Sequence, residues 1–247
     1  MERLHGPPRK PAPMNPRRVL ITRPEPGATE TAARIAALGF APIVAPLLEI
    51  RPLPVRLPPP ERIAAILLTS GGAVAPLPAS YHGRPVLAVG DATARRAREA
   101  GFAHASSAEG DAEALAALAR TRFAPKDGTL LLASGRGQGQ ALAATLRAAG
   151  YRVARRVVYW AAPVPRLPPM VAAALMDPHM NTVMFFSAET ARRFLILVRA
   201  AGLLDRLRDR EAITIGRQAA MALEEAPWSR VRVASHPTQD EMLALLR

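Results

Sequence analysis

Short apolar runs alternate with amphipathic segments along the chain, beginning at Val19. The runs are continuous rather than alternating, which is typical of strands buried on both faces of a parallel sheet. They occupy residues 18–22, 62–70, 85–90, 128–135, 182–187, 212–216 and 230–235, with a proline-interrupted extended segment at 41–50. Helical patterns at 28–38, 91–100 and 111–119 lie between them. The pattern therefore predicts an α/β fold built on parallel sheets.

The apolar pattern also repeats within the chain. Residues 17–50, moved by 111 positions, match 128–161 in their order of strand, loop, helix, glycine and strand. Residues 66–74 resemble 183–191, and residues 89–97 resemble 215–223. The order of these pieces places one half of the repeat inside the other. We therefore predict two lobes, each a parallel sheet flanked by helices.

The boundaries of these lobes follow from the repeat. An inserted α/β domain at 51–160 lies within an outer, discontinuous α/β domain formed by 18–50 and 161–247. Because the chain crosses between the domains twice, a two-stranded hinge joins them. Tyr159, one of three tyrosines in the chain, lies in the second crossing and is expected to flank the cleft between the lobes.

Composition adds limits on class and location. A hydrophobic content of 49% is enough for sizeable cores, and the absence of cysteine excludes disulfides and thiol nucleophiles. No apolar run has the roughly 18 residues of a membrane span, so we expect no membrane partner. Residues 1–17 read as a disordered basic tail, and Met14 is an alternative start to Met1. We expect a cytoplasmic monomer.

The net charge of +13 raises the question of a nucleic-acid partner. The basic residues are arginines apart from Lys10 and Lys126, and they are scattered along the chain without interleaved aromatic residues. This pattern argues against nucleic-acid binding. A positive cleft would instead concentrate a strongly acidic small substrate.

Small polar residues follow most of the predicted strands. Ligands of parallel sheets bind beyond the carboxyl ends of the strands, where backbone N–H groups and hydroxyls receive anions. The same residue types also serve simply as helix caps and tight turns. The candidate binding residues are Thr22, Arg23, Thr69, Ser70, Gly71, Thr93, Ser134, Gly135, Arg136, Ser187, Gly216 and Thr238.

Other chemical machinery is missing from the sequence. The segment SGRGQG at 134–139 is rich in glycine but lacks the lysine of a phosphate-binding loop and the spacing of a dinucleotide site. The five histidines show no metal-ligand spacing. We therefore expect neither a metal nor another cofactor.

Several motifs together resemble uroporphyrinogen-III synthases. They are VLITRP, LLTSGGAV, LAVGDATA, SGRGQ with the following AGYRV and VVY, FFSAETA, TIGRQAA and HPTQDEML, and they cover roughly 18–247. Each motif is weak by itself, whereas their order and spacing are specific. The bilobed architecture of that family, with one lobe inserted into the other, agrees with the repeat.

The resemblance implies a reaction and a substrate. The family closes linear hydroxymethylbilane into a macrocycle, inverts its last pyrrole ring and releases water, in tetrapyrrole (haem) biosynthesis, without a cofactor. The substrate is a linear tetrapyrrole with eight carboxylates. Tyr159 matches the tyrosine most often tied to catalysis in the family. Its phenol would hydrogen-bond or protonate the departing hydroxyl, or it would merely pack in the hinge.

Thr69, Ser70 and Thr93 match polar loop positions of the family, whereas the outer lobe departs from its pattern. Ala219 stands where a threonine is usual, and Phe186 stands before Ser187 where a threonine is common. These departures leave a second interpretation open, a non-catalytic bilobed binder of an acidic small molecule or tetrapyrrole.

Overall fold

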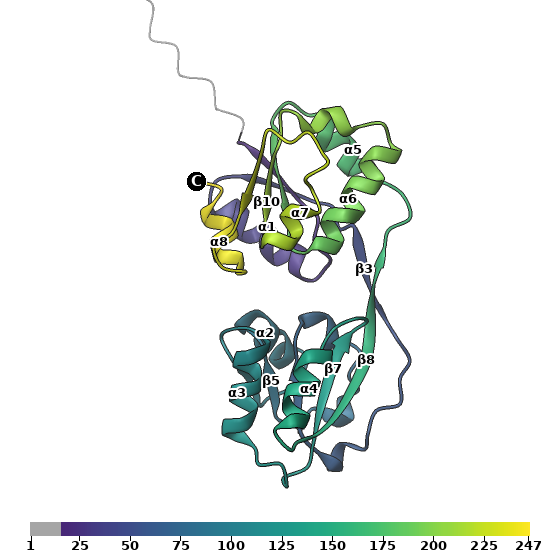
Figure 1. The fold of residues 1–247 in the computed structure, drawn as a ribbon, viewed down its shortest axis with the longest axis vertical. Helices are drawn as coiled ribbons and strands as arrows, with labels where there is room; N and C mark the ends of the chain where they lie inside the picture. Colours follow the sequence, from purple (N-terminus) through teal and green to yellow (C-terminus); the bar gives the residue numbers. More distant parts are fainter. Residues whose placement is uncertain (1–15) are drawn as a thin grey trace, which may run out of the picture. The chain divides into compact units, whose positions relative to one another are not determined.

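The structure, a computed structural model, describes residues 16–247 and divides them into two compact units (Figure 1). The first unit contains the described residues up to Ile21, Thr31–Ala45 and Pro168–Arg247. The second contains Thr22–Glu30 and Pro46–Leu167. The predicted tail at 1–17 lies outside the described residues except for its last two positions.

The first unit is built on a five-stranded sheet in which every pairing is parallel. Its strand order is β11-β10-β9-β1-β2. The strands are β1 (Arg18–Ile21), β2 (Ala41–Val44), β9 (Met180–Phe185), β10 (Glu211–Thr214) and β11 (Arg230–Val233). The helices around it are α1 (Gly27–Ala37), α5 (Pro169–Met176), α6 (Ala188–Ala200), η4 (Leu204–Leu207), α7 (Arg217–Met221) and α8 (Gln239–Ala244).

The second unit is built on a six-stranded sheet with the order β3-β8-β7-β4-β5-β6. The strands are β3 (Leu48–Pro52), β4 (Ile63–Leu68), β5 (Val86–Ala88), β6 (Ala105–Ser107), β7 (Thr129–Gly135) and β8 (Arg152–Pro163). The helices are η1 (Pro60–Arg62), η2 (Gly71–Ala73), η3 (Ala79–Tyr81), α2 (Asp91–Glu99), α3 (Ala112–Arg122) and α4 (Gln140–Ala148). The α/β fold with helices flanking both sheets confirms the predicted class.

One strand departs from the predicted parallel arrangement. β3 pairs with β8 in antiparallel register, from Leu48 opposite Pro163 to Pro52 opposite Tyr159, so the second sheet is mixed. The reason is the chain path, because β3 carries the chain into the second unit and β8 carries it out. The segment predicted as extended at 41–50 is accordingly two strands, β2 and β3, separated around Pro46.

The strand orders of the two sheets show the repeat that the sequence predicts. When β9, β10, β11, β1 and β2 are matched with β4, β5, β6, β7 and β8, the parallel strands of both sheets have the same spatial order. In the second unit the five matched strands follow one another along the chain. In the first unit, two of them precede the other unit and three follow it. The two sheets are therefore the same arrangement with permuted connections.

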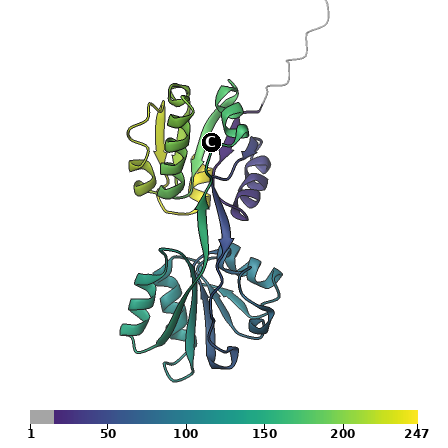
Figure 2. The same ribbon diagram turned by 90° about the vertical axis from the view of Figure 1, so that its right-hand side faces the viewer.

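The second unit has an apolar layer on each face of its sheet, and helices lie on both faces (Figure 2). Ile66 and Leu68 of β4 pack toward η2 and α2, while Ala65 and Leu67 of the same strand pack toward α3 and α4. This alternation along a wholly buried strand explains the continuous apolar run in the sequence. Among residues 16–247, no helix is both long and apolar enough to cross a membrane.

Candidate functional site

Each sheet contains a point where the connections change direction, and such points are the usual ligand sites of parallel sheets. In the second unit this point lies between β4 and β7, and in the first unit it lies between β9 and β1. The carboxyl ends of these four strands and the residues that follow them contain nine of the predicted binding residues. They are Thr69, Ser70, Gly71, Ser134, Gly135, Arg136, Thr22, Arg23 and Ser187.

Thr69 and Ser134 carry buried hydroxyls at the carboxyl ends of the neighbouring strands β4 and β7. The register that pairs Leu68 with Ala133 places the next residues, Thr69 and Ser134, side by side. Within the described part of the chain, neither Thr69 Oγ1 nor Ser134 Oγ has a hydrogen-bond partner, although both atoms are buried. Buried hydroxyls normally have partners, so this pair is prepared to bind a water molecule or a ligand oxygen.

The loop after β4 is held by its own hydroxyl and by an arginine of α2. Ser70 begins η2, and its Oγ accepts a hydrogen bond of 3.3 Å from the Gly72 amide. The Arg96 guanidinium packs against Gly71, where any side chain would collide with it. Thr93, one turn before Arg96, is only 7% exposed. Arg96 thus lies at the loop that contains Ser70 and Gly71, whereas Thr93 is a buried residue of α2.

A β-bulge determines where Tyr159 points. Along β7 and β8, Ser134 pairs with Val157 while Gly135 pairs with Tyr159, so Val158 is the extra residue. Successive side chains of a regular strand point to opposite faces, but here Val158 and Tyr159 both join the apolar layer under η2. A bulge re-aims a side chain in this way. Tyr159 is consequently 2% exposed rather than lying openly along the connection.

The Tyr159 ring is clamped between two glycines and its hydroxyl faces Gln138. A methyl group on Gly72 would lie 3.2 Å from Tyr159 Cζ, and one on Gly135 would lie 2.6 Å from the same atom. The hydroxyl donates a hydrogen bond of 3.1 Å to Gln138 Oε1. Gln138 itself is exposed. The buried phenol is therefore bonded to an exposed, flexible side chain.

Thr22 and Arg23 follow β1 directly. Thr22 is fully buried, and the guanidinium of Arg23 packs against Gly27 at the start of α1. Burial lowers the pKa of Arg23 from its ordinary value, because desolvation disfavours the charged form. Arg23 thus supplies a partly desolvated positive charge close to the end of β1.

The remaining candidates in the first unit begin helices. Ser187 Oγ accepts a hydrogen bond of 3.1 Å from the Thr190 amide at the start of α6. Thr238 Oγ1 accepts one of 3.3 Å from the Glu241 amide at the start of α8. Gly216 begins α7 without a side-chain cap. Capping therefore accounts for Ser187 and Thr238 locally, which is the simpler of the two readings that the sequence allows.

The positions that depart from the family pattern are placed as follows. Ala219 lies in α7 and is 2% exposed, so no side-chain polar group is available there. Phe186 is half-buried directly after β9. Neither residue supplies a hydroxyl at the carboxyl ends of the first sheet.

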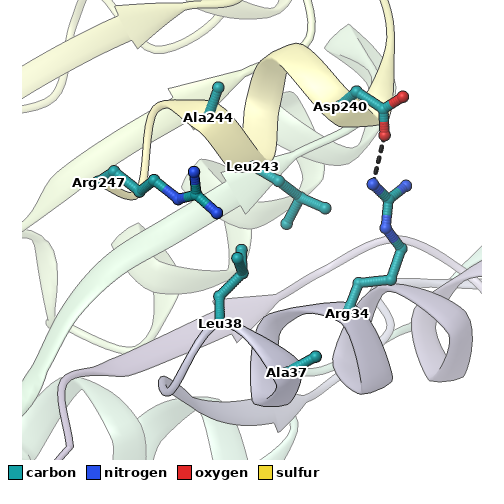
Figure 3. Close-up of a pocket in the computed structure, with 7 residues that line it drawn as sticks. All are labelled: Arg34, Ala37, Leu38, Asp240, Leu243, Ala244 and Arg247. Atoms are coloured by element: carbon teal, nitrogen blue, oxygen red, sulfur yellow. Dashed lines mark hydrogen bonds and ion pairs between the residues drawn. The ribbon is translucent and has the colours of Figure 1, made fainter.

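Surface hollows occur away from these strand ends. One of about 360 Å³ lies between α1 and α8, where Leu38 faces Leu243 and Arg34 pairs with Asp240 (Figure 3). None of the predicted binding residues lines it. Its apolar floor and ion pair hold α8 against α1. In the described residues, no group of three or more His, Asp or Glu side chains is arranged to hold a metal ion.

Arg96 and Gln138 belong to this site but are not among the residues predicted from the sequence. Arg96 stands three positions after Thr93, a spacing that places both side chains on one face of a helix, and this signal was available. Gln138 lies in the loop of Gly137 and Gly139, both with φ of +78°. Glycine at two left-handed positions predicts a tight loop, but not that Gln138 would meet Tyr159.

A family model matches most of this chain, and solved structures share its fold. The model of the family described as uroporphyrinogen-III synthase HemD matches residues 29–244. The crystal structure of uroporphyrinogen-III synthetase from Helicobacter pylori matches with a TM-score of 0.59 and 18% identity, over 93% of this chain and 98% of that one. A mutant uroporphyrinogen III synthase from Thermus thermophilus matches with a TM-score of 0.47 and 22% identity, over 93% and 97%. No curated protein matches the chain.

Proposed function

This chain belongs to the uroporphyrinogen-III synthase family, and we propose on that basis how its residues cyclise hydroxymethylbilane to uroporphyrinogen III. The reaction removes water from the substrate, closes the ring and inverts the last pyrrole. Spontaneous closure yields the uninverted isomer, so the protein must above all fix the conformation of the substrate. Catalysis then rests on orientation and on stabilising the charge that develops as hydroxide leaves.

The strand ends of both sheets bind the carboxylates of the substrate. Thr69, Ser70, Gly71, Thr93, Ser134, Gly135 and Arg136 serve at the second sheet, and Thr22, Arg23, Ser187, Gly216 and Thr238 serve at the first. The observation that carries this assignment is the unpartnered pair of hydroxyls on Thr69 and Ser134 at the switch point of the second sheet. Arginines supply the positive charge that eight carboxylates require.

Tyr159 donates a hydrogen bond to the departing hydroxyl of the substrate. Its phenol already donates to Gln138 Oε1, and Gln138 is exposed. A substrate oxygen therefore replaces the amide oxygen as the acceptor when Gln138 moves aside. The clamp formed by Gly72 and Gly135 fixes the ring during this exchange, so the hydroxyl is oriented before the substrate arrives.

The isomer assay tests the reaction as a whole. Purified protein mixed with freshly prepared hydroxymethylbilane should give the type III isomer, whereas the enzyme-free control gives the type I isomer. Product analysis by chromatography after oxidation separates the two. An isomer ratio equal to that of the enzyme-free control would instead favour a non-catalytic binder.

A threonine substitution tests substrate binding by the hydroxyl pair. Thr69→Val keeps the shape of the side chain and removes an oxygen that bonds to no protein atom, so the free energy of unfolding should stay within about 0.5 kcal/mol of wild type. The KM for hydroxymethylbilane should rise about threefold to tenfold, as expected for one lost hydrogen bond.

The matched control for this substitution is Thr121→Val. Thr121 Oγ1 donates to the Ala117 carbonyl near the end of α3, so it does not directly follow a strand. Its loss should leave KM unchanged. Equal KM values for wild type and Thr69→Val would remove Thr69 from the binding site.

A further inference from the structure

Trp160 directly follows Tyr159, and neither the repeat nor the proposed reaction accounts for it. It is half-buried in the second unit. The other tryptophan, Trp228, is part of an aromatic cluster with Phe185 and Phe194. Trp160 instead meets a cation, because the guanidinium carbon of Arg136 lies 4.9 Å from the centroid of its ring.

The bulge in β8 creates this contact. It brings Tyr159 beside Gly135, and the Arg136 amide then donates a hydrogen bond of 3.0 Å to the Tyr159 carbonyl. The backbone of Arg136 is thereby fixed one step beyond the end of β7, next to Trp160. Exposed cation–π contacts of this kind favour one position of a flexible side chain about twofold to fivefold.

A second arginine beside Trp160 shows what distinguishes Arg136. Arg51 of β3 lies opposite Trp160 in the antiparallel pair, and it forms an ion pair of 2.9 Å with Glu49. Arg136 has no acidic partner among residues 16–247 and is exposed. The arginine opposite Trp160 is therefore neutralised by the protein, whereas Arg136 keeps its charge.

We propose that Trp160 is a positioning residue that holds Arg136 as the receptor for one carboxylate of the substrate. A guanidinium that lies over an aromatic face keeps its N–H edges free, and these edges match a carboxylate in bidentate geometry. The proposal rests on the proposed function and deepens it. Because Trp160 already restricts the Arg136 side chain, less conformational entropy is lost when Arg136 binds the carboxylate.

Steady-state kinetics with hydroxymethylbilane test this assignment. Arg136→Gln should raise KM about tenfold, the effect of one charge-assisted hydrogen bond, with kcat within about twofold of wild type. Trp160→Leu should raise KM about threefold, and Trp160→Phe, which keeps an aromatic face, should restore most of the loss. In the Arg136→Gln background, Trp160→Leu should have no further effect.

Arg152→Gln is the matched control. Arg152 is exposed and lies at the opposite end of β8, so its KM should equal that of wild type. If KM rises as much for Arg152→Gln as for Arg136→Gln, the effect comes from the net charge of the protein. That result would overturn the subsite. Additive effects of Trp160→Leu and Arg136→Gln would overturn the role of Trp160.

A binding measurement separates this proposal from the reaction itself. Calorimetric titration with uroporphyrin III, a stable octacarboxylate, should show about tenfold weaker binding for Arg136→Gln than for wild type. Coproporphyrin III, which has four carboxylates, serves as the charge-poor comparison. If wild type forms the type III isomer and Arg136→Gln binds uroporphyrin III and turns over substrate as wild type does, the subsite is refuted. The proposed function then still stands. Weakened porphyrin binding without isomer formation would support the subsite and refute the function.

Discussion

Tyr159→Phe should lower turnover of hydroxymethylbilane about a hundredfold, the size of effect that a positioned proton donor contributes. The substitution removes only the oxygen, and the ring stays clamped between Gly72 and Gly135. The lost hydrogen bond to Gln138 is replaced by water because Gln138 is exposed. The free energy of unfolding should therefore change by no more than about 1 kcal/mol. Initial rates at saturating substrate, together with a thermal melt, measure both quantities.

The isomer ratio made by Tyr159→Phe separates two roles of the hydroxyl. If the hydroxyl protonates the departing group, the variant should be slow but still form mainly the type III isomer at high enzyme concentration. If it holds the substrate in shape, the share of the type I isomer should increase. Turnover equal to wild type would leave Tyr159 with a packing role alone.

Gly135→Ala should be the most damaging conservative change at the site. The added methyl would lie 2.6 Å from Tyr159 Cζ and 2.8 Å from its hydroxyl oxygen. The ring has little room to move toward Gly72, because a methyl group added there would already lie 3.2 Å from Tyr159 Cζ. Overpacking of this kind costs about 1–3 kcal/mol, and displacement of the phenol should lower turnover about as much as Tyr159→Phe does. Chemical denaturation and initial rates give the two values.

Two variants show whether the Gly135→Ala effect comes from the ring. Gly83→Ala adds a methyl group with nothing within 4 Å, so both stability and turnover should stay at the wild-type level. Gly135→Ala combined with Tyr159→Leu should cost less stability than the sum of the two single changes, because the smaller side chain relieves the collision. Strict additivity would mean that the methyl group strains the backbone instead.

The sequence predicts the sheets of this protein better than it predicts the burial of Tyr159. Buried parallel strands leave continuous apolar runs, and the repeat of strand, helix and glycine gives the order in which they pair. Both features are local or periodic, so they can be read directly. The antiparallel pairing of β3 with β8 depends on where two crossings of the chain meet, and no residue pattern in 48–52 encodes it.

The burial of Tyr159 and the position of Arg136 could not be predicted for a related reason. Both depend on one extra residue, Val158, in the pairing of β8 with β7. A bulge shifts every later side chain to the other face of a strand, yet the segment VVYW has the composition of an ordinary strand. The strand-end hydroxyls were predictable because they only require knowing where strands end. Whether each one caps a helix or stays without a partner depends on the atoms around it.

The strand β3 also changes which backbone groups lie at the edge of the second sheet. β8 is twelve residues long, and without a neighbour its outer edge would offer unpaired N–H and C=O groups to another chain. β3 covers the apolar half of that edge, where Tyr159 to Pro163 are paired. The half that β3 leaves uncovered carries Arg152, Arg155 and Arg156, and like charges on an edge strand oppose pairing with a second copy. β3 is then the edge strand of this sheet, and its charged Glu49 and Arg51 and its Pro52 oppose pairing with a further strand.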